Sequence, residues 1–303
     1  MTTPGILLAF GLVLCLGVPH ARAAEAAPLF DGQRAFDYVE RQCAFGPRNP
    51  GSEGHRKCLE FLEAELKAAG AAVRRQSFTY TLPGGAPLPM TNLIARWHPE
   101  KTDRLLLCAH WDTRPWADLD PDSTRRHLPI LGANDGASGV AVLLELARHL
   151  KAHPPSRGID IVFFDGEDLG TDDHREGFFR GAREYARSLG GARLPGRGIL
   201  LDMVGDADLF FSLEGNSVRG APETVEWFWQ AAREVAPAFF GDQIGYYVED
   251  DHLPLIAAGI PCMNLIDFDY PYWHTHADTP DKVSPGSLQV VGDVLVHLLY
   301  TRP

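Results

Sequence analysis

The 303-residue chain has little cysteine, no basic tract and no internal repeat. Its five cysteines include no Cys-x-x-Cys pair, which excludes a zinc site built from thiolates. The formal net charge is −12, and without a cluster of basic residues the composition argues against nucleic acid as a partner. The hydrophobic content is 45%, which is enough for the core of one large α/β domain or two small ones.

No apolar run is long enough to span a bilayer comfortably. The run Gly5–Val18 is too short for a transmembrane helix but suits the core of a signal peptide. Small residues then stand at the two positions that a signal peptidase inspects, so we predict cleavage after Ala23. The mature protein would comprise residues 24–303 and be periplasmic or secreted. Leu14 is bulky where a lipoprotein signal has a small residue before Cys15, which favours a soluble exported protein over a lipid-anchored one.

Four cysteines remain in the predicted mature chain. Cys43 and Cys58 flank a Gly/Pro-rich loop and could form a disulfide in an oxidising compartment. They could equally be free and buried, and the sequence does not choose between the two. Cys108 and Cys262 stand in apolar strand-like segments, so we predict that both belong to the core.

Apolar strands alternate with amphipathic helices along the chain. This alternation favours a mostly parallel sheet that is covered by helices on both faces. Helices are predicted at Ser52–Ala69, Gly139–Leu150, Glu176–Leu189, Pro222–Val235 and Ser287–Leu299. Strands are predicted at Thr91–Trp97, Leu105–Ala109, Ile159–Phe164, Gly198–Asp202 and Ile260–Ile266. Residues 82–89 and 119–131 are rich in Pro and Gly, which indicates surface loops near or over a site.

Most of these strands lead directly into a polar segment. In an open α/β sheet, ligands bind outside the carboxyl ends of the strands, so the segments are placed where a site on this fold would need them. Together they supply enough oxygen and nitrogen ligands for a zinc site with a carboxylate base beside it. The five segments are Ala109–Asp112, Ala133–Gly136, Asp165–Asp168, Leu201–Met203 and Trp273–Thr275.

Two of these segments also have plain structural interpretations. His110 follows a buried strand, and Asp112 could orient its imidazole by accepting the other ring N–H, although a capped structural histidine would look the same. Asp135 precedes an apolar helix, whose dipole would keep it ionised, and in isolation it could be an N-cap. The small residues around Asp135 indicate instead a tight loop that something can approach closely.

The other acidic segments are harder to explain structurally. Asp165, Glu167 and Asp168 crowd the end of a buried strand, which is costly unless a cation offsets them. Two adjacent acidic residues can also have different roles, so that one binds the metal ion and its neighbour exchanges protons. Asp202 is a further acid at the end of an apolar strand.

Two more clusters leave a choice open. His274 and His276 are rival metal ligands that spacing alone cannot separate, and the aromatic residues before His274 could wall a pocket. The cluster Glu249–His252 precedes a short helix and is either a solvated turn or part of the site.

In this order and spacing, the segments resemble the zinc exopeptidase family that contains bacterial zinc aminopeptidases and animal-type glutaminyl cyclases. The resemblance runs from about Phe36 to the C-terminus. It implies a single three-layer α/β/α catalytic domain with a central mixed, mostly parallel sheet.

The motifs of that family also imply roles for individual residues. Asp135, Asp168 and His274 match its zinc ligands, which favours His274 over His276, and Glu167 matches the general acid or base. In the two-metal aminopeptidases, the equivalents of His110 and Asp202 hold a second zinc. One departure is that Asp168 stands where the family has the longer glutamate.

Within the family, two features resemble the cyclase branch: the segment Glu249–Pro254 and Trp273 before the ligand histidine. This implies one zinc and cyclisation of the N-terminal glutamine of peptides to pyroglutamate with loss of ammonia. Glu167, Asp202 and Asp250 would then share protons, and Trp273 and Phe268 would line the pocket. The chain departs from the cyclases at Phe178 and Phe179, where they have a tryptophan, and at Asn264, where they have a histidine.

Two alternatives remain. A secreted zinc aminopeptidase would use the same residues with one or two zinc ions, and Glu167 would activate water. A non-catalytic binding module would keep the fold and lose a metal-binding position, but every such position is filled by a residue able to bind zinc.

Overall fold

The computed structural model describes residues 1–2, 30–190 and 193–302. The predicted signal segment Gly5–Val18 and the predicted cleavage after Ala23 lie outside the described residues, so export stays a prediction. Among the residues that are described, no helix has the length and apolar character needed to cross a membrane.

A six-stranded sheet forms the centre of the molecule, in the order β1-β2-β4-β3-β5-β8. Its parallel part comprises β4, β3, β5 and β8, and β2 joins β4 and β1 in antiparallel fashion. This confirms the predicted mixed, mostly parallel sheet. The bounds are β1 Ala72–Thr81, β2 Pro87–Trp97, β3 Arg104–His110, β4 Gly158–Phe164, β5 Arg197–Asp202 and β8 Cys262–Ile266.

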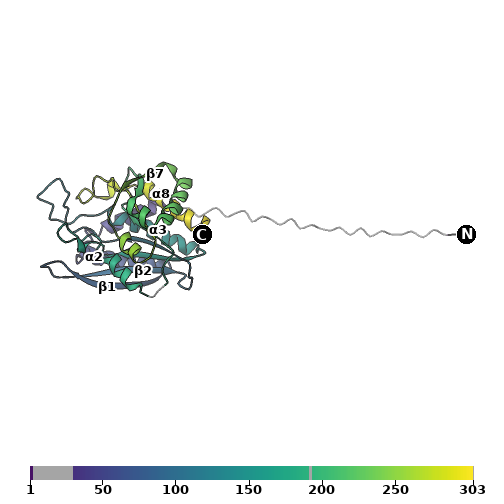
Figure 1. Cartoon of the computed structure of the whole chain (residues 1–303), viewed down its shortest axis with the longest axis horizontal. Helices are drawn as coiled ribbons and strands as arrows, with labels where there is room; N and C mark the ends of the chain where they lie inside the picture. Colours follow the sequence, from purple (N-terminus) through teal and green to yellow (C-terminus); the bar gives the residue numbers. More distant parts are fainter. Residues whose placement is uncertain (3–29, 191–192, 303) are drawn as a thin grey trace.

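Helices cover both faces of the sheet because successive strand residues point to opposite sides. On β3, Leu105 and Leu107 pack in the large core with helices of one layer, whereas Leu106 and Cys108 pack on the other face with α4 and α7. Figure 1 shows β1 and β2 at one end of the molecule, away from β7 and α8. The helices are α1 Gly32–Cys43, α2 Glu53–Ala68, α3 Ala137–Ala152, α4 Arg180–Ser188, α5 Gly215–Gly220, α6 Pro222–Val235, α7 His252–Ala257 and α8 Pro285–Thr301.

The predicted helices and strands are all present, with ends that differ by a few residues. The prediction omitted α1, although Asp31 caps it by accepting a hydrogen bond from the Arg34 N–H. It also omitted β1 and the separate parallel pair of β6 (Phe211–Glu214) and β7 (Phe240–Tyr246). β1 and β7 are largely exposed, so they lack the apolar runs by which the other strands were found.

All four cysteines of the described residues are buried free thiols. Cys43 and Cys58 are therefore free and buried and do not form a disulfide in the structure. Burial raises the pKa of the Cys58 thiol to about 12. Cys108 and Cys262 lie in the core of the sheet as predicted.

Close packing between α3 and β5 brings the start of the helix to the carboxyl edge of the sheet. A Cβ at Gly139 would lie 2.3 Å from the carbonyl oxygen of Leu201, so only glycine allows this approach. Gly136, with a φ of 100°, is the N-cap of α3, so Asp135 is not the cap itself. As a result Asp135 lies beside the last residues of β3 and β5.

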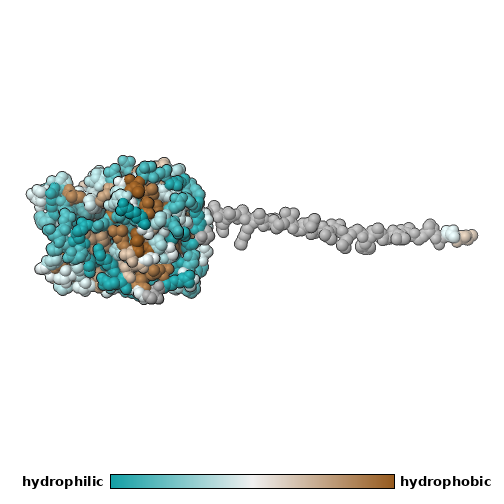
Figure 2. All heavy atoms as spheres, in the orientation of Figure 1, coloured by the Kyte–Doolittle hydropathy of each residue, from teal (hydrophilic) through white to brown (hydrophobic). Residues whose placement is uncertain are grey.

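Figure 2 shows hydrophilic residues over most of one face, with a band of hydrophobic residues across its middle. Among the large apolar side chains that are exposed, Leu119 and Tyr247 line the cavity described next.

Candidate functional site

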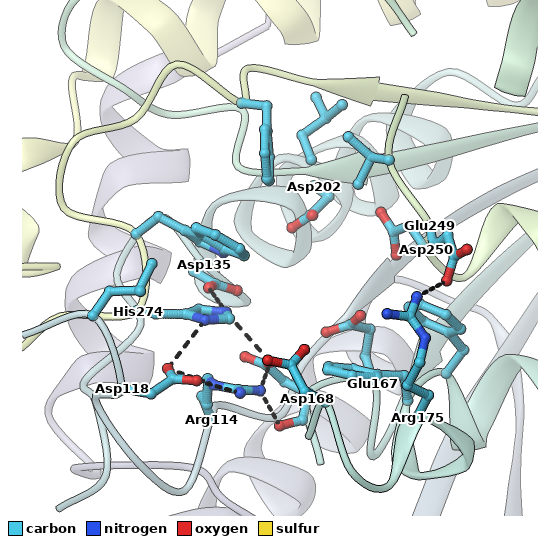
Figure 3. A pocket seen from close by; sticks show the side chains of 18 of the residues that line it. Arg114, Asp118, Asp135, Glu167, Asp168, Arg175, Asp202, Glu249, Asp250 and His274 are labelled. Atoms are coloured by element: carbon cyan, nitrogen blue, oxygen red, sulfur yellow. Dashed lines mark hydrogen bonds and ion pairs between the residues drawn. The ribbon is translucent and has the colours of Figure 1, made fainter. Parts of the chain in front are cut away.

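A cavity of about 560 Å³ lies at the carboxyl ends of β4 and β5 (Figure 3). Its lining brings together most of the predicted site residues, which are far apart in the sequence. These are Asp135, Glu167, Asp168, Asp202, Asp250, Phe268, Trp273 and His274. Of the two predicted loops, residues 119–131 contribute Leu119 to the lining, whereas residues 82–89 contribute nothing.

One group of three side chains can hold a metal ion. Asp135, Asp168 and His274 each offer a ligand atom, and these atoms lie within 4.8 Å of one another. The Nε2 atom of His274 is 3.4 Å from Asp168 Oδ1 and 3.6 Å from Asp135 Oδ2. The Oδ2 atoms of both aspartates are buried and have no hydrogen-bond partner. Since buried carboxylate oxygens are costly when unpaired, this geometry fits a divalent cation.

A second group shares Asp135 with the first. His110 Nε2 lies 3.2 Å from Asp135 Oδ1 and 3.1 Å from Asp202 Oδ1, and the three residues form another set that can hold a metal ion. Asp135 thus faces the two groups with different oxygens. Histidine nitrogens and carboxylate oxygens are among the ligands that zinc takes in proteins.

Asp112 does not orient His110 as predicted. Its Oδ1 is 3.8 Å from His110 Nδ1, too far for a hydrogen bond. Instead the carboxylate accepts hydrogen bonds from the backbone N–H groups of Glu167 and Asp168, at 3.1 and 3.4 Å. Asp112 therefore holds the loop that carries the two central acids, a role that the spacing within the sequence could not reveal.

Glu167 lies in the cavity beside both groups, with 14% of its side chain exposed. Burial and the neighbouring carboxylate of Asp168 raise the pKa of Glu167 well above its usual range. A carboxyl group with a raised pKa is a better proton acceptor than an ordinary carboxylate, which suits a general acid or base.

Asp250 is buried in the same wall of the cavity. Burial, Asp202 and Asp251 raise the pKa of Asp250 well above the ordinary value. The Nδ2 atom of Asn264 donates a hydrogen bond to Asp250 Oδ2 at 2.6 Å. Asn264, which departs from the cyclase pattern, therefore fixes Asp250 from the neighbouring strand β8.

The structure decides the two choices that the sequence left open, between His274 and His276 and over the cluster Glu249–His252. His276 lies outside both metal-capable groups, and its Nδ1 is 2.7 Å from Asp120 Oδ2. In the cluster Glu249–His252, the solvated-turn interpretation is wrong for all but Glu249, since the other three residues are buried. Glu249 pairs with Arg175 at the cavity wall, as Figure 3 shows, and His252 faces the buried Glu214 at 3.2 Å.

Aromatic side chains form the apolar part of the lining. The ring centroids of Trp273 and Phe268 are 4.9 Å apart, and Trp273 lies 3.9 Å from the His274 ring. Phe178 and Phe179 also line the cavity and pack against each other.

Sequence reasoning missed several residues that shape the site. Arg48 is fully buried and donates to the backbone carbonyls of Trp111, Leu131 and Gly132. The Asp278 carboxylate accepts hydrogen bonds from the backbone N–H groups of Asn134 and Asp135. These bonds connect the Asp135 loop to the segment that carries His274. Two further residues, Arg114 and Asp118, contact the ligand group itself. For Arg114, Asp118 and Asp278 the only signal in the sequence was nearness to the predicted motifs, and for Arg48 there was none.

The chain is similar to known proteins over most of its length. Residues 92–299 match the model of peptidase family M28 and contain every candidate site residue. A bovine glutaminyl-peptide cyclotransferase-like protein is 27% identical over 317 residues, which cover 93% of this chain and 79% of the relative.

Solved structures give higher identities. A glutaminyl cyclase from Bacteroides thetaiotaomicron is 38% identical, with a TM-score of 0.88, and the match covers 91% of this chain and 100% of that one. A leucine aminopeptidase precursor from the same species is 39% identical, also with a TM-score of 0.88, covering 91% and 99%. Proteins named for two different activities therefore share this fold.

Proposed function

The chain belongs to peptidase family M28, and within that family we propose that it is a zinc-dependent glutaminyl cyclase acting on the N-termini of peptides. It would convert an N-terminal glutamine to pyroglutamate and release ammonia. The observation that carries this proposal is the cluster of Glu167, Asp202 and Asp250 in one cavity beside the ligand group of Asp135, Asp168 and His274.

The donor set fits the metal of the proposal. Asp135, Asp168 and His274 would hold zinc, because two of their oxygens are buried without a partner and the three ligand atoms converge. When bound there, zinc would supply a Lewis acid for the carbonyl oxygen of the γ-carboxamide.

Glu167 would carry the proton transfer. The α-amine of the substrate attacks the carbon of its own side-chain amide, so a new C–N bond forms while the bond to the amide nitrogen breaks. Glu167 takes the proton that the amine loses and returns it to the departing nitrogen, which leaves as ammonia. Because both reacting groups belong to one residue, the protein mainly has to hold a compact conformer of that residue.

The remaining residues would position the substrate. Asp202 and Asp250 line the same cavity and would share protons with Glu167, and Asn264 fixes Asp250. Trp273 and Phe268 would wall the glutamine side chain and exclude water.

A specific observation also supports the second candidate, a zinc aminopeptidase. His110, Asp135 and Asp202 form a second group that can hold a metal ion, as a two-zinc mechanism would need. Glu167 would then take a proton from an attacking water.

Two model substrates and a zinc determination separate the candidates. The purified protein is expected to form pyroglutamate from glutamine β-naphthylamide, to leave leucine p-nitroanilide intact and to contain one zinc per chain. Release of free leucine with no pyroglutamate formed, and two zinc ions per chain, would overturn the cyclase proposal in favour of the peptidase.

Zinc binding should depend on pH through His274. Burial lowers the pKa of this imidazole, but Asp168, Asp118 and Asp135 outweigh burial and raise it to about 9 in the metal-free protein. Zinc needs the neutral imidazole, so binding below that pH must displace a proton. We expect zinc affinity to rise about tenfold per pH unit between about pH 7 and pH 9.

The metal-free protein should show the opposite trend in stability. The contribution of the His274 imidazolium to folding is fully present below the unfolded-state pKa of about 6.5 and is lost as the pH rises through about 9. Chelator competition and denaturant unfolding across this range test both trends. A zinc affinity that does not change with pH would contradict the ligand role of His274.

A further inference from the structure

Arg114 joins two acidic side chains beside the proposed zinc ligands. It lies in the loop between β3 and α3, and its guanidinium is buried. Nη1 donates to Asp168 Oδ1 at 2.9 Å and to the backbone carbonyl of Asp168 at 3.3 Å. Nε and Nη2 donate to the two carboxylate oxygens of Asp118 at 2.9 and 2.6 Å. The planar fork of arginine is thus used on both sides, which lysine could not reproduce.

Asp118 in turn faces the proposed histidine ligand. Its Oδ1 is 3.3 Å from His274 Nδ1 (Figure 3). When the Nδ1–H points to this carboxylate, the lone pair of the ring lies on Nε2, the nitrogen nearest Asp135 and Asp168. Asp118 therefore selects the tautomer that a metal ion needs.

The same arginine binds the Asp168 carboxylate. Its Nη1 donates to Oδ1, the oxygen 3.4 Å from His274 Nε2, and Oδ2 is buried with no partner. Asp168 has a shorter side chain than a glutamate, so its reach depends more on where its backbone lies. Arg114 restrains both the side chain and the backbone of Asp168, because it binds the carboxylate and the carbonyl of that residue.

From this geometry we propose that Arg114 and Asp118 are positioning residues, which hold Asp168 and His274 in the arrangement that binds zinc. The inference rests on the zinc ligands of the proposed function. It does not depend on whether the zinc serves cyclisation or peptide hydrolysis.

The chain contains a matched control for this proposal. Asp120 pairs with His276 at 2.7 Å, using the same residue types from the same two segments, each two positions further along. His276 belongs to neither metal-capable group. Asp118→Asn and Asp120→Asn therefore each alter one carboxylate–imidazole pair, but only the first pair includes a proposed ligand.

The test measures the zinc dissociation constant of the purified protein by competition with a chromophoric chelator. Outer-shell partners of metal ligands typically contribute 10–100-fold to affinity, so Asp118→Asn is expected to weaken zinc binding by about that factor. Asp120→Asn is expected to match the parent. Arg114→Lys keeps the positive charge but loses the planar set of guanidinium donors, so it should also weaken zinc binding. Thermal unfolding of the metal-free variants reports separately whether a substitution destabilises the fold.

Each outcome bears on a different claim. If the parent protein binds no zinc, the proposed zinc-dependent function is wrong. A parent that binds zinc, with Asp118→Asn binding it equally well, would overturn only the positioning roles. Equal weakening by Asp118→Asn and Asp120→Asn would also overturn them, because a general loosening of the loop would then explain the effect.

Discussion

A Glu167→Gln variant is expected to lose about 10²- to 10⁴-fold in kcat, the usual contribution of a positioned general acid or base, while it keeps its zinc. Glutamine has nearly the same shape as glutamate but cannot take up a proton near neutral pH. Glu167 is outside both metal-capable groups, so its charge is not needed to hold the ion. Its backbone N–H still donates to Asp112 in the variant, so the loop should keep its position.

The measurement is the initial rate of pyroglutamate formation together with the zinc content of the same preparation. Glu176→Gln is the matched control, because Glu176 stands on the same loop after β4 but is exposed and does not line the cavity. A Glu167→Gln variant as active as its parent would be inconsistent with both enzymatic proposals. Loss of zinc along with activity would make Glu167 a ligand instead.

An Asp135→Asn variant is expected to lose zinc and with it all activity above background. Asp135 is the one residue common to both metal-capable groups, and it faces each with a different oxygen. The substitution removes the negative charge between His110 and His274. The loss of affinity should exceed the roughly 10–100-fold that outer-shell changes cost.

Asp202→Asn provides the comparison, because Asp202 belongs only to the group with His110. In a one-zinc cyclase, Asp202→Asn keeps the zinc and loses rate. In a two-zinc peptidase, it loses one of two ions. If Asp135→Asn retained zinc with the parent's affinity, the proposed ligand set would be wrong.

The sequence alone determined the fold class and the main parts of the site. Buried parallel strands read as apolar runs, and the polar residues after them must gather at one edge of the sheet because parallel strands end there. This is why the segments that carry Asp168 and Asp202 could be placed at that edge before any contact was known, whereas the resemblance to the zinc exopeptidases was needed to choose Asp135 and His274 as ligands. The exposed strands β1 and β7 lack such apolar runs and were missed.

Only the tertiary structure decided which polar groups meet. Asp112 and His110 are two residues apart, yet the carboxylate turns to the loop after β4, because the pairing of β3 with β4 brings that loop beside it. His276 has the same side chain as His274 but faces Asp120 rather than the metal-capable group. Arg114 reaches Asp168 across 54 positions of sequence. Such contacts depend on side-chain direction and on the packing of distant loops, and no local spacing encodes either.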